Sequence, residues 1–508
     1  MASLLGDVLV LWVFCCFTAF SSSLGADRLP NIVLLLADDQ DLLLGGETPM
    51  QFTSSFFNQR GSNMSNFFVN TPVCCPSRAT LISGRYPHNF LDLNGGGCMH
   101  MYVTGEGFTN KSIGWYMKKL GYKNGHFGKY FNPGYGGMGD DFCNPDVMEP
   151  LPGFDEWFSM CDDNAYYRNE FTVNGKLWRS GTSPEHYMTS LVGNASVAFI
   201  QEALVKEEPF FAFIAPHAPH VPATPAPWYQ GEFEGFKAPR TPNYNHTALD
   251  HHYVIRQQEH MTEMVAEMSD ELFRNRWRTL LSVDDIMIAV VDAVDKHGQL
   301  DNTYFLWTSD HGYQLGQFNL PSCKLQPYEH DLHVPFHIAG PKVRPGRNFS
   351  EVASMVDLAP TLIELGGGHP PDTMDGTSFA GLVTNSSIGD DIKVTPPPRS
   401  DKSMIEYWSL GHVVRYEHLI DGTNNTYLGV RLVNDTHNWL YVEYFPNRET
   451  ITFLEDGMAE CELFDTKSDY YQMKNLCGQP QHASLVEELH HFIHKKVFCT
   501  GKRCREQL

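Results

Sequence analysis

Three uninterrupted apolar runs mark the places where this chain is expected to build its core. They cover residues 32–37, 209–215 and 303–308. A less apolar stretch at 121–130 is interpreted as a further strand and its end. A strand that is apolar on both faces is typical of a parallel sheet covered by helices on each side. Apolar residues at helical spacing predict helices over 186–206 and 275–297. Together these patterns predict an α/β domain.

The C-terminal part of the chain shows a different pattern. Apolar and polar residues alternate at 427–433 and 439–444, which predicts antiparallel strands, and a terminal helix is expected at 482–498. A stretch with three consecutive prolines precedes them and predicts a linker over 385–403. Because 508 residues exceed one ordinary core, we expect a main domain at 27–384 and a smaller antiparallel-sheet subdomain at 404–508.

The first 26 residues are expected to be a signal peptide. An apolar run from Val8 to Phe20 is followed by small residues. Asp7 and the lack of a basic residue before the run leave an uncleaved anchor as the alternative, although the run is short for a membrane span. No later segment is expected to be long enough to span a bilayer. Eight Asn-x-Ser/Thr sequons predict a glycosylated surface, at Asn63, Asn110, Asn194, Asn245, Asn348, Asn385, Asn424 and Asn434.

The charge balance restricts the kind of partner. A formal net charge of −23 and a pI near 5.4 argue against nucleic acid and against a generally basic surface for polyanions. An anionic substrate would therefore have to be held by a local pocket.

Chemistry-bearing residues follow the three apolar strands directly: Asp38-Asp39, then His217 and His220, then Asp310-His311. Ligands of open α/β sheets collect at the carboxyl ends of the strands. Adjacent carboxylates repel each other unless a cation or hydrogen bonds hold them. The functional interpretation is a site for a hard cation, Ca²⁺ or Mg²⁺, and the alternative is a solvated turn.

The segment Cys74-Cys75-Pro76-Ser77-Arg78, with Gly84-Arg85 after it, is the most distinctive stretch. Proline at the start of a helical run predicts a helix N-terminus, where backbone N–H groups favour an anion. The segment resembles the signature of the type I sulfatases. That resemblance implies an alkaline-phosphatase-like sulfatase fold, with a large mixed central sheet flanked by helices. It also implies that Cys74 is oxidised to formylglycine by a formylglycine-generating enzyme.

The resemblance extends to the other candidate residues. It implies a Ca²⁺ ion held by Asp38, Asp39, the modified Cys74, Asp310 and His311. It assigns Arg78 and Lys129 to the aldehyde hydrate that serves as nucleophile, Asp310 to the base, and His220 with Lys324 to the leaving oxygen and the sulfate. His220 is preferred over His217 because Pro219-His220-Val221-Pro222 matches the family's Pro-His-x-Pro form.

One position departs from the common family pattern. Many members read Gly-Lys-Trp-His, whereas this chain reads Gly128-Lys129-Tyr130-Phe131-Asn132, with Phe131 in place of a catalytic histidine. The glucosamine-6-sulfatase branch, with Gly-Lys-Tyr-Leu-Asn, shows a similar pattern. The resemblance therefore predicts removal of sulfate from glycans that contain 6-sulfated N-acetylglucosamine, by a lysosomal or secreted enzyme. The alternatives are a broader arylsulfatase, a phosphohydrolase of the same superfold and an inactive glycan-binding homologue.

The cysteines agree with an exported protein. Of 12 cysteines, Cys15 and Cys16 leave with the signal peptide and Cys74 is set aside for modification, which leaves nine. Nine is odd, so at least one thiol is free, and Cys75 is the candidate. Cys499 and Cys504 are close enough for a small loop, but the connectivity stays open.

Overall fold

The computed structural model of the protein describes residues 28–90, 110–132, 152–161, 165–384, 399–409, 421–447 and 458–506. The predicted signal peptide, Asn385 and most of the predicted linker lie outside the described residues. Of the other sequons, Asn110, Asn194, Asn348 and Asn434 are exposed, and Asn63, Asn245 and Asn424 are partly exposed.

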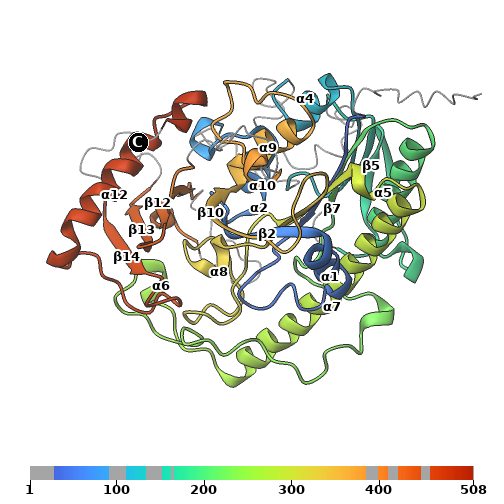
Figure 1. Ribbon diagram of the computed structural model, residues 1–508. Helices are drawn as coiled ribbons and strands as arrows, with labels where there is room; N and C mark the ends of the chain where they lie inside the picture. Colours follow the sequence, from blue (N-terminus) through green and yellow to red (C-terminus); the bar gives the residue numbers. More distant parts are fainter. Residues whose placement is uncertain are drawn as a thin grey trace, which may run out of the picture.

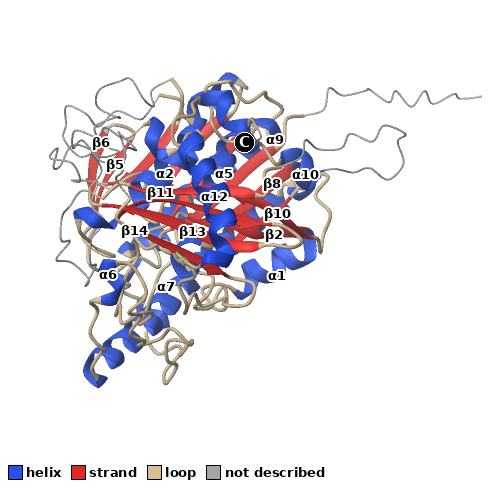
Figure 2. Cartoon of the chain, turned by 90° about the vertical axis from the view of Figure 1, so that its left-hand side faces the viewer, coloured by secondary structure: helices blue, strands red, loops and turns tan. Residues whose placement is uncertain are grey.

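A ten-stranded mixed sheet forms the centre of the molecule (Figure 2). Its order is β10-β2-β9-β8-β1-β7-β3-β4-β5-β6, and β8, β1, β7, β3 and β4 run parallel. The strands are β1 (Asn31–Ala37), β2 (Gly61–Phe68), β3 (Lys123–Gly128), β4 (Glu156–Met160), β5 (Glu170–Val173), β6 (Lys176–Arg179), β7 (Phe210–Ala215), β8 (Thr303–Ser309), β9 (Phe336–Ala339) and β10 (Asn348–Ser354). The predicted apolar strands are thus confirmed as the middle of the sheet.

Helices cover both faces of this sheet, which is why its central strands lack a polar face. Val33 and Leu35 of β1 pack into one apolar cluster, while Leu34 and Leu36 pack into the other. Successive side chains of a strand point to opposite faces, so both layers are filled by the same short run. One layer contains α1 (Gln51–Arg60), α5 (Met188–Val205) and α7 (Glu263–Lys296); the other contains α2 (Cys74–Ser83), α4 (Ile113–Lys119), α9 (Leu358–Leu365) and α10 (Ala380–Thr384).

A smaller antiparallel sheet lies beside the main body, at the left of Figure 1. It consists of β11 (Lys402–Tyr407), β12 (Thr426–Val433), β13 (Asn438–Phe445) and β14 (Glu460–Asp465). Tyr427 faces the main core, whereas Leu428 packs with the C-terminal helix α12 (Ala483–Lys496). The strands are buried on both faces because the sheet is enclosed between the main body and α12. Two short helices, α6 (Tyr253–Arg256) and α8 (Glu329–Leu332), lie in long connections.

One predicted helix begins earlier in the structure than expected, and another corrects an expectation about membrane spans. Helix α7 begins at Glu263 rather than residue 275, because the Thr262 side chain caps it by accepting from the N–H of Val265. Its first turns expose Met264 and Met268, so no apolar stripe marked them. Helix α5 is 18 residues long and apolar enough to span a membrane, which corrects the expectation that no later segment could. Half of it is buried, and it packs on α7, β3 and β7 as a core helix does.

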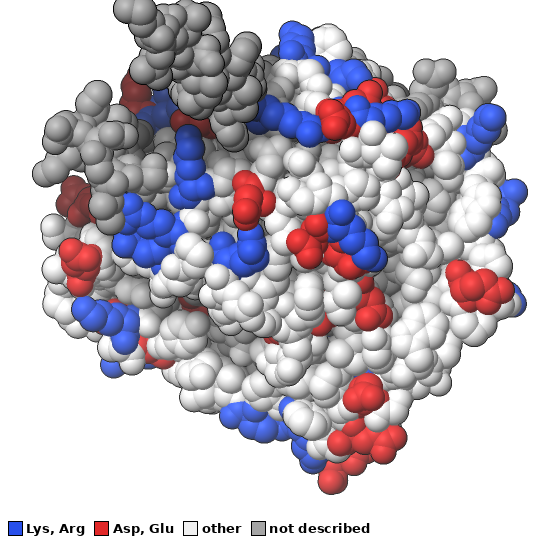
Figure 3. Space-filling view, turned by 45° about the vertical axis from the view of Figure 1, so that its right-hand side comes forward, with Lys and Arg blue, Asp and Glu red and all other residues white. Residues whose placement is uncertain are grey.

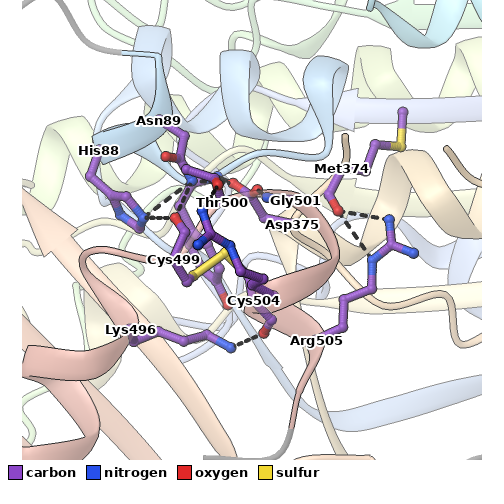
Figure 4. The surroundings of a disulfide bond; sticks show 12 residues. His88, Asn89, Met374, Asp375, Lys496, Cys499, Thr500, Gly501, Cys504 and Arg505 are labelled. Atoms are coloured by element: carbon purple, nitrogen blue, oxygen red, sulfur yellow. Dashed lines mark hydrogen bonds between the residues drawn. A yellow bond between two sulfur atoms is a disulfide. The ribbon is translucent and has the colours of Figure 1, made fainter. Parts of the chain in front are cut away.

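The end of the chain is fastened to the main body. Cys499 and Cys504 form a disulfide, and Asn89 donates to both Cys499 O and Asp375 (Figure 4). Asp375 also accepts from the N–H of Gly501. A second disulfide joins Cys461 and Cys477 in the small sheet region.

The prediction for Cys75 is wrong. Cys75 is disulfide-bonded, whereas Cys74 and Cys323 are buried thiols. Sequence alone could not distinguish them, because disulfide formation depends on which thiols the fold brings within reach.

On the face shown in Figure 3, acidic and basic side chains are interspersed.

Candidate active site

The carboxyl ends of four neighbouring strands converge on one buried site. Asp38 and Asp39 follow β1, Lys129 follows β3, His217 and His220 follow β7, and Asp310 and His311 follow β8. The N-terminus of α2 adds Cys74 and Arg78, and a loop adds Lys324. The nine residues predicted as catalytic or metal-binding therefore lie together, with His217 beside them.

Asp38 and Asp39 are fully buried and are surrounded by cationic groups. Asp38 Oδ2 lies 2.7 Å from Lys129 Nζ. Asp39 Oδ1 lies 2.9 Å from Lys324 Nζ and 3.0 Å from His311 Nε2. Burial would raise the pKa of Asp38, but Lys129 and other cations lower it well below its usual value. In the same way burial would raise the pKa of Asp39, but Lys324, His220 and His311 together lower it well below its usual value, so both residues are carboxylates.

Arg78 connects the residues that follow β8 and β3, the two outer strands of the site. Its Nε donates to Asp310 Oδ2 at 2.7 Å, and its Nη1 donates to the carbonyl oxygen of Lys129 at 2.6 Å. Burial would lower the pKa of Arg78, but Asp310 and Asp38 raise it. The other oxygen of Asp310 accepts from the backbone N–H groups of Asp39 and His311, each at 3.0 Å. Both oxygens of Asp310 therefore accept hydrogen bonds, which fixes the orientation of the carboxylate.

Cys74 is the first residue of α2 and faces this charged cluster. Its Sγ lies 3.3 Å from Lys324 Nζ, 3.3 Å from His311 Nε2 and 3.8 Å from Asp39 Oδ1. The helix begins at Cys74, so Pro76 is its third residue and not its first. The helix start places Cys74 where backbone N–H groups and Lys324 favour an oxyanion.

The two histidines after β7 both belong to the site, with different partners. His217 Nδ1 lies 3.0 Å from Asp38 Oδ2. The centroids of the His217 and His220 rings are 4.5 Å apart. His220 Nδ1 lies 2.6 Å from the carbonyl oxygen of Val221, so Nε2 is directed to the site, 3.9 Å from Asp39 Oδ2. Burial, together with Lys324 and Lys129, lowers the pKa of His220 well below its usual value. A role for His220 as an acid therefore requires that a bound anionic substrate raise this pKa.

Two neighbours, Ser77 and Arg276, had been given no role in the site. His217 was named from the sequence but ranked below His220. Ser77 Oγ donates to the carbonyl oxygen of Asp310 at 2.5 Å. Arg276, a buried arginine on amphipathic α7, donates to the carbonyl oxygen of Asp39 at 2.6 Å. Phe131, at the family's histidine position, is buried in the apolar core against Tyr130.

The donor set suits a divalent cation. Asp38, Cys74, Asp310 and His311 each offer a ligand atom within 4.8 Å of the others. Asp38 Oδ1 is buried and accepts no hydrogen bond from the described part of the chain. His311 Nδ1 lies 2.8 Å from the carbonyl oxygen of Gly312, which orients Nε2 toward the carboxylates. Burial would lower the pKa of His311, but Asp310 and Asp39 raise it well above its usual value, so a bound cation would compete with a proton there.

Known proteins are similar to this chain in sequence and in fold. A model of the family described as Sulfatase matches residues 30–368. N-acetylglucosamine-6-sulfatase of Capra hircus is 32% identical over 511 residues, which are 96% of this chain and 86% of that protein. A putative extracellular sulfatase Sulf-1 homolog of Caenorhabditis elegans is 35% identical over 370 residues, 70% of this chain and 49% of that protein.

A solved structure supports the fold. It contains a protein in complex with its substrate D-glucosamine-2-N,6-O-disulfate, and superimposes with a TM-score of 0.72 at 19% identity. The match covers 94% of this chain and 98% of the solved one. At that identity the likeness concerns the fold alone.

Proposed function

The chain belongs to the sulfatase family and is a sulfatase, and from this premise we propose that it removes sulfate from glycans that contain 6-sulfated N-acetylglucosamine. The observation that carries the proposal is the buried cluster around Cys74, in which a sulfur side chain faces Lys324, His311 and Asp39. The similarity to N-acetylglucosamine-6-sulfatase over nearly the whole chain supports the choice of substrate.

We propose that residue 74 carries a formylglycine and that Ca²⁺ is held by Asp38, Asp39, residue 74, Asp310 and His311. The thiol of Cys74 marks the place of the aldehyde oxygens. The aldehyde hydrate would supply the oxygen nucleophile, and the cation, once bound, would polarise a sulfate oxygen. Three buried carboxylates favour a hard cation, and Ca²⁺ prefers oxygen ligands.

The chain's own residues hold the charges of the reaction. Lys324 and Lys129 would neutralise the sulfate and the hydrate, because both amines are buried where electrostatic interactions are strong. Arg78 holds the carboxylate of Asp310 in place through its hydrogen bond. His220 Nε2 would return a proton to the leaving sugar oxygen. If Asp310 is the base, the proton that it takes would compete with the hydrogen bonds that both its oxygens accept.

The predicted domain boundaries and the route of the protein are also proposals. We place the catalytic domain at 27–384, the linker at 385–403 and the C-terminal subdomain at 404–508. We propose that the chain enters the secretory pathway, meets the formylglycine-generating enzyme there, and reaches the lysosome or the extracellular space. Disulfides are typical of that environment and support this route.

A sulfate-release assay tests the proposal. The protein is made in cells that contain the modifying enzyme, and rates are compared on N-acetylglucosamine-6-sulfate and on a small aryl sulfate. We expect a higher kcat/KM on the sugar and an aldehyde mass at residue 74. Faster aryl sulfate hydrolysis would favour a broad arylsulfatase, and active protein with an unmodified Cys74 would refute the mechanism.

A further inference from the structure

Two histidines and a glutamate meet outside the active site, between the terminal helix and the small sheet. His490 and His494 lie one turn apart on α12, and Glu443 lies on β13 (Figure 1). His490 Nδ1 is 2.8 Å from Glu443 Oε1, and His494 Nε2 is 3.1 Å from Oε2. We propose that these three residues form a second metal site, which binds Zn²⁺.

The donor set and its spacing suit zinc. Imidazole nitrogen and carboxylate oxygen are common zinc ligands, and three protein ligands leave a fourth position for water. Residues four apart on a helix share a face, and the two imidazole rings are 3.9 Å apart. The three ligand atoms lie within 4.8 Å of one another. Tetrahedral zinc with bonds of about 2.0–2.1 Å needs ligand atoms about 3.3 Å apart, so small side-chain movements would complete the site.

The burial of Glu443 gives a physical reason for an ion here. Its side chain is fully buried, and its face of β13 packs into an apolar cluster with Tyr441, Leu489 and Ile493. A buried carboxylate is costly unless it is paired or coordinated. The hydroxyl of Tyr441 hydrogen-bonds to the Glu443 carboxylate. Such an outer hydrogen bond orients a metal-ligating carboxylate.

The site is open to an ion from one side. The side chains of His490 and His494 are 37% and 24% exposed, so zinc and a water ligand can reach them. Cys461, directly opposite Glu443 in β14, is bound in a disulfide and does not compete as a thiolate. Zinc would pin α12 to β13. The segment after α12 is fastened to Asn89 and Asp375 of the main body, so the ion would strengthen attachment of the C-terminal subdomain.

The simpler alternative is that the two rings only hydrogen-bond to the carboxylate. Zinc titration of the full chain distinguishes the two, with Ca²⁺ present in excess to occupy the active-site cation position. His490→Gln and His494→Gln are compared with His491→Gln, whose side chain is exposed on another face of α12. Wild type and His491→Gln should bind one more Zn²⁺ than the other two variants. Loss of a ligand should weaken zinc binding by at least about 100-fold.

Two further readouts keep the test independent of catalysis. Both readouts should appear in wild type and His491→Gln only. Co²⁺ in place of zinc should give the absorption bands of tetrahedral cobalt, and Zn²⁺ should raise Tm. Equal zinc binding by His490→Gln and His491→Gln would overturn the proposal. If a variant fails to fold, anomalous scattering from a wild-type crystal soaked in Zn²⁺ decides: a peak between the three side chains supports the site, and its absence overturns it.

Discussion

His126 should make the main domain lose stability as the pH falls. It is fully buried on β3, two residues before the strand ends, and its ring packs against Tyr130, Trp157 and Phe213 at 4.9, 4.8 and 5.1 Å. Burial, with a smaller effect of Arg78, lowers the pKa of His126 from 6.5 to about 3. The native state therefore keeps the ring neutral at a pH where the unfolded chain has bound a proton.

The sign and size follow from linkage. Between pH 6.5 and about 3 the unfolded state binds more protons than the native state, so the free energy of unfolding decreases as the pH falls through this window. Going from pH 7 to pH 5, the loss due to His126 amounts to about 2 kcal/mol. At pH 7 the contribution is close to zero. The penalty falls in the pH range of an acidic compartment.

Urea unfolding of wild type and His126→Phe at pH 7 and pH 5 measures this contribution. The difference between the two proteins cancels the other titrating groups. His126→Phe should gain about 2 kcal/mol relative to wild type on going from pH 7 to pH 5. Phe213→Leu is the matched control, because it alters the same cluster without a titrating group; its destabilisation should be equal at both pH values. A stability difference for His126→Phe that stays constant with pH would refute the reasoning.

Further predictions concern the site itself. Cys74→Ala should lose sulfate release by at least about a thousandfold with little change in Tm. Cys75→Ala should instead cost about 2–5 kcal/mol of stability by removing a disulfide, and the opposite pattern of rates and melting would show that the two cysteines were assigned wrongly. Lys129→Met leaves buried Asp38 without its closest cation, so kcat should fall by about 10²–10³-fold, and an unchanged kcat would exclude Lys129 from the charge balance. Chelation with EGTA should abolish sulfate release and added Ca²⁺ should restore it; full activity in metal-free protein would contradict the cation site.

Local sequence patterns determined the centre of the fold. Strands β1, β7 and β8 could be predicted because a strand covered on both faces must be apolar throughout, and that requirement is visible in six or seven consecutive residues. The end of each strand then gave Asp38-Asp39, His220 and Asp310-His311, since parallel strands share one carboxyl edge. The segment at Cys74 was recognisable because the chemistry needs its residues at fixed spacing.

Only the tertiary structure decided which distant groups meet. Lys324 lies in a loop without local pattern, yet its amine contacts Asp39 and Cys74, which are 285 and 250 residues away. The state of Cys75 and Cys323, and the meeting of Glu443 with His490 and His494, depend in the same way on packing between separate elements. Hydrophobic periodicity reports what one segment buries, whereas bridging, ion pairing and metal ligation require partners whose positions are set by the whole fold.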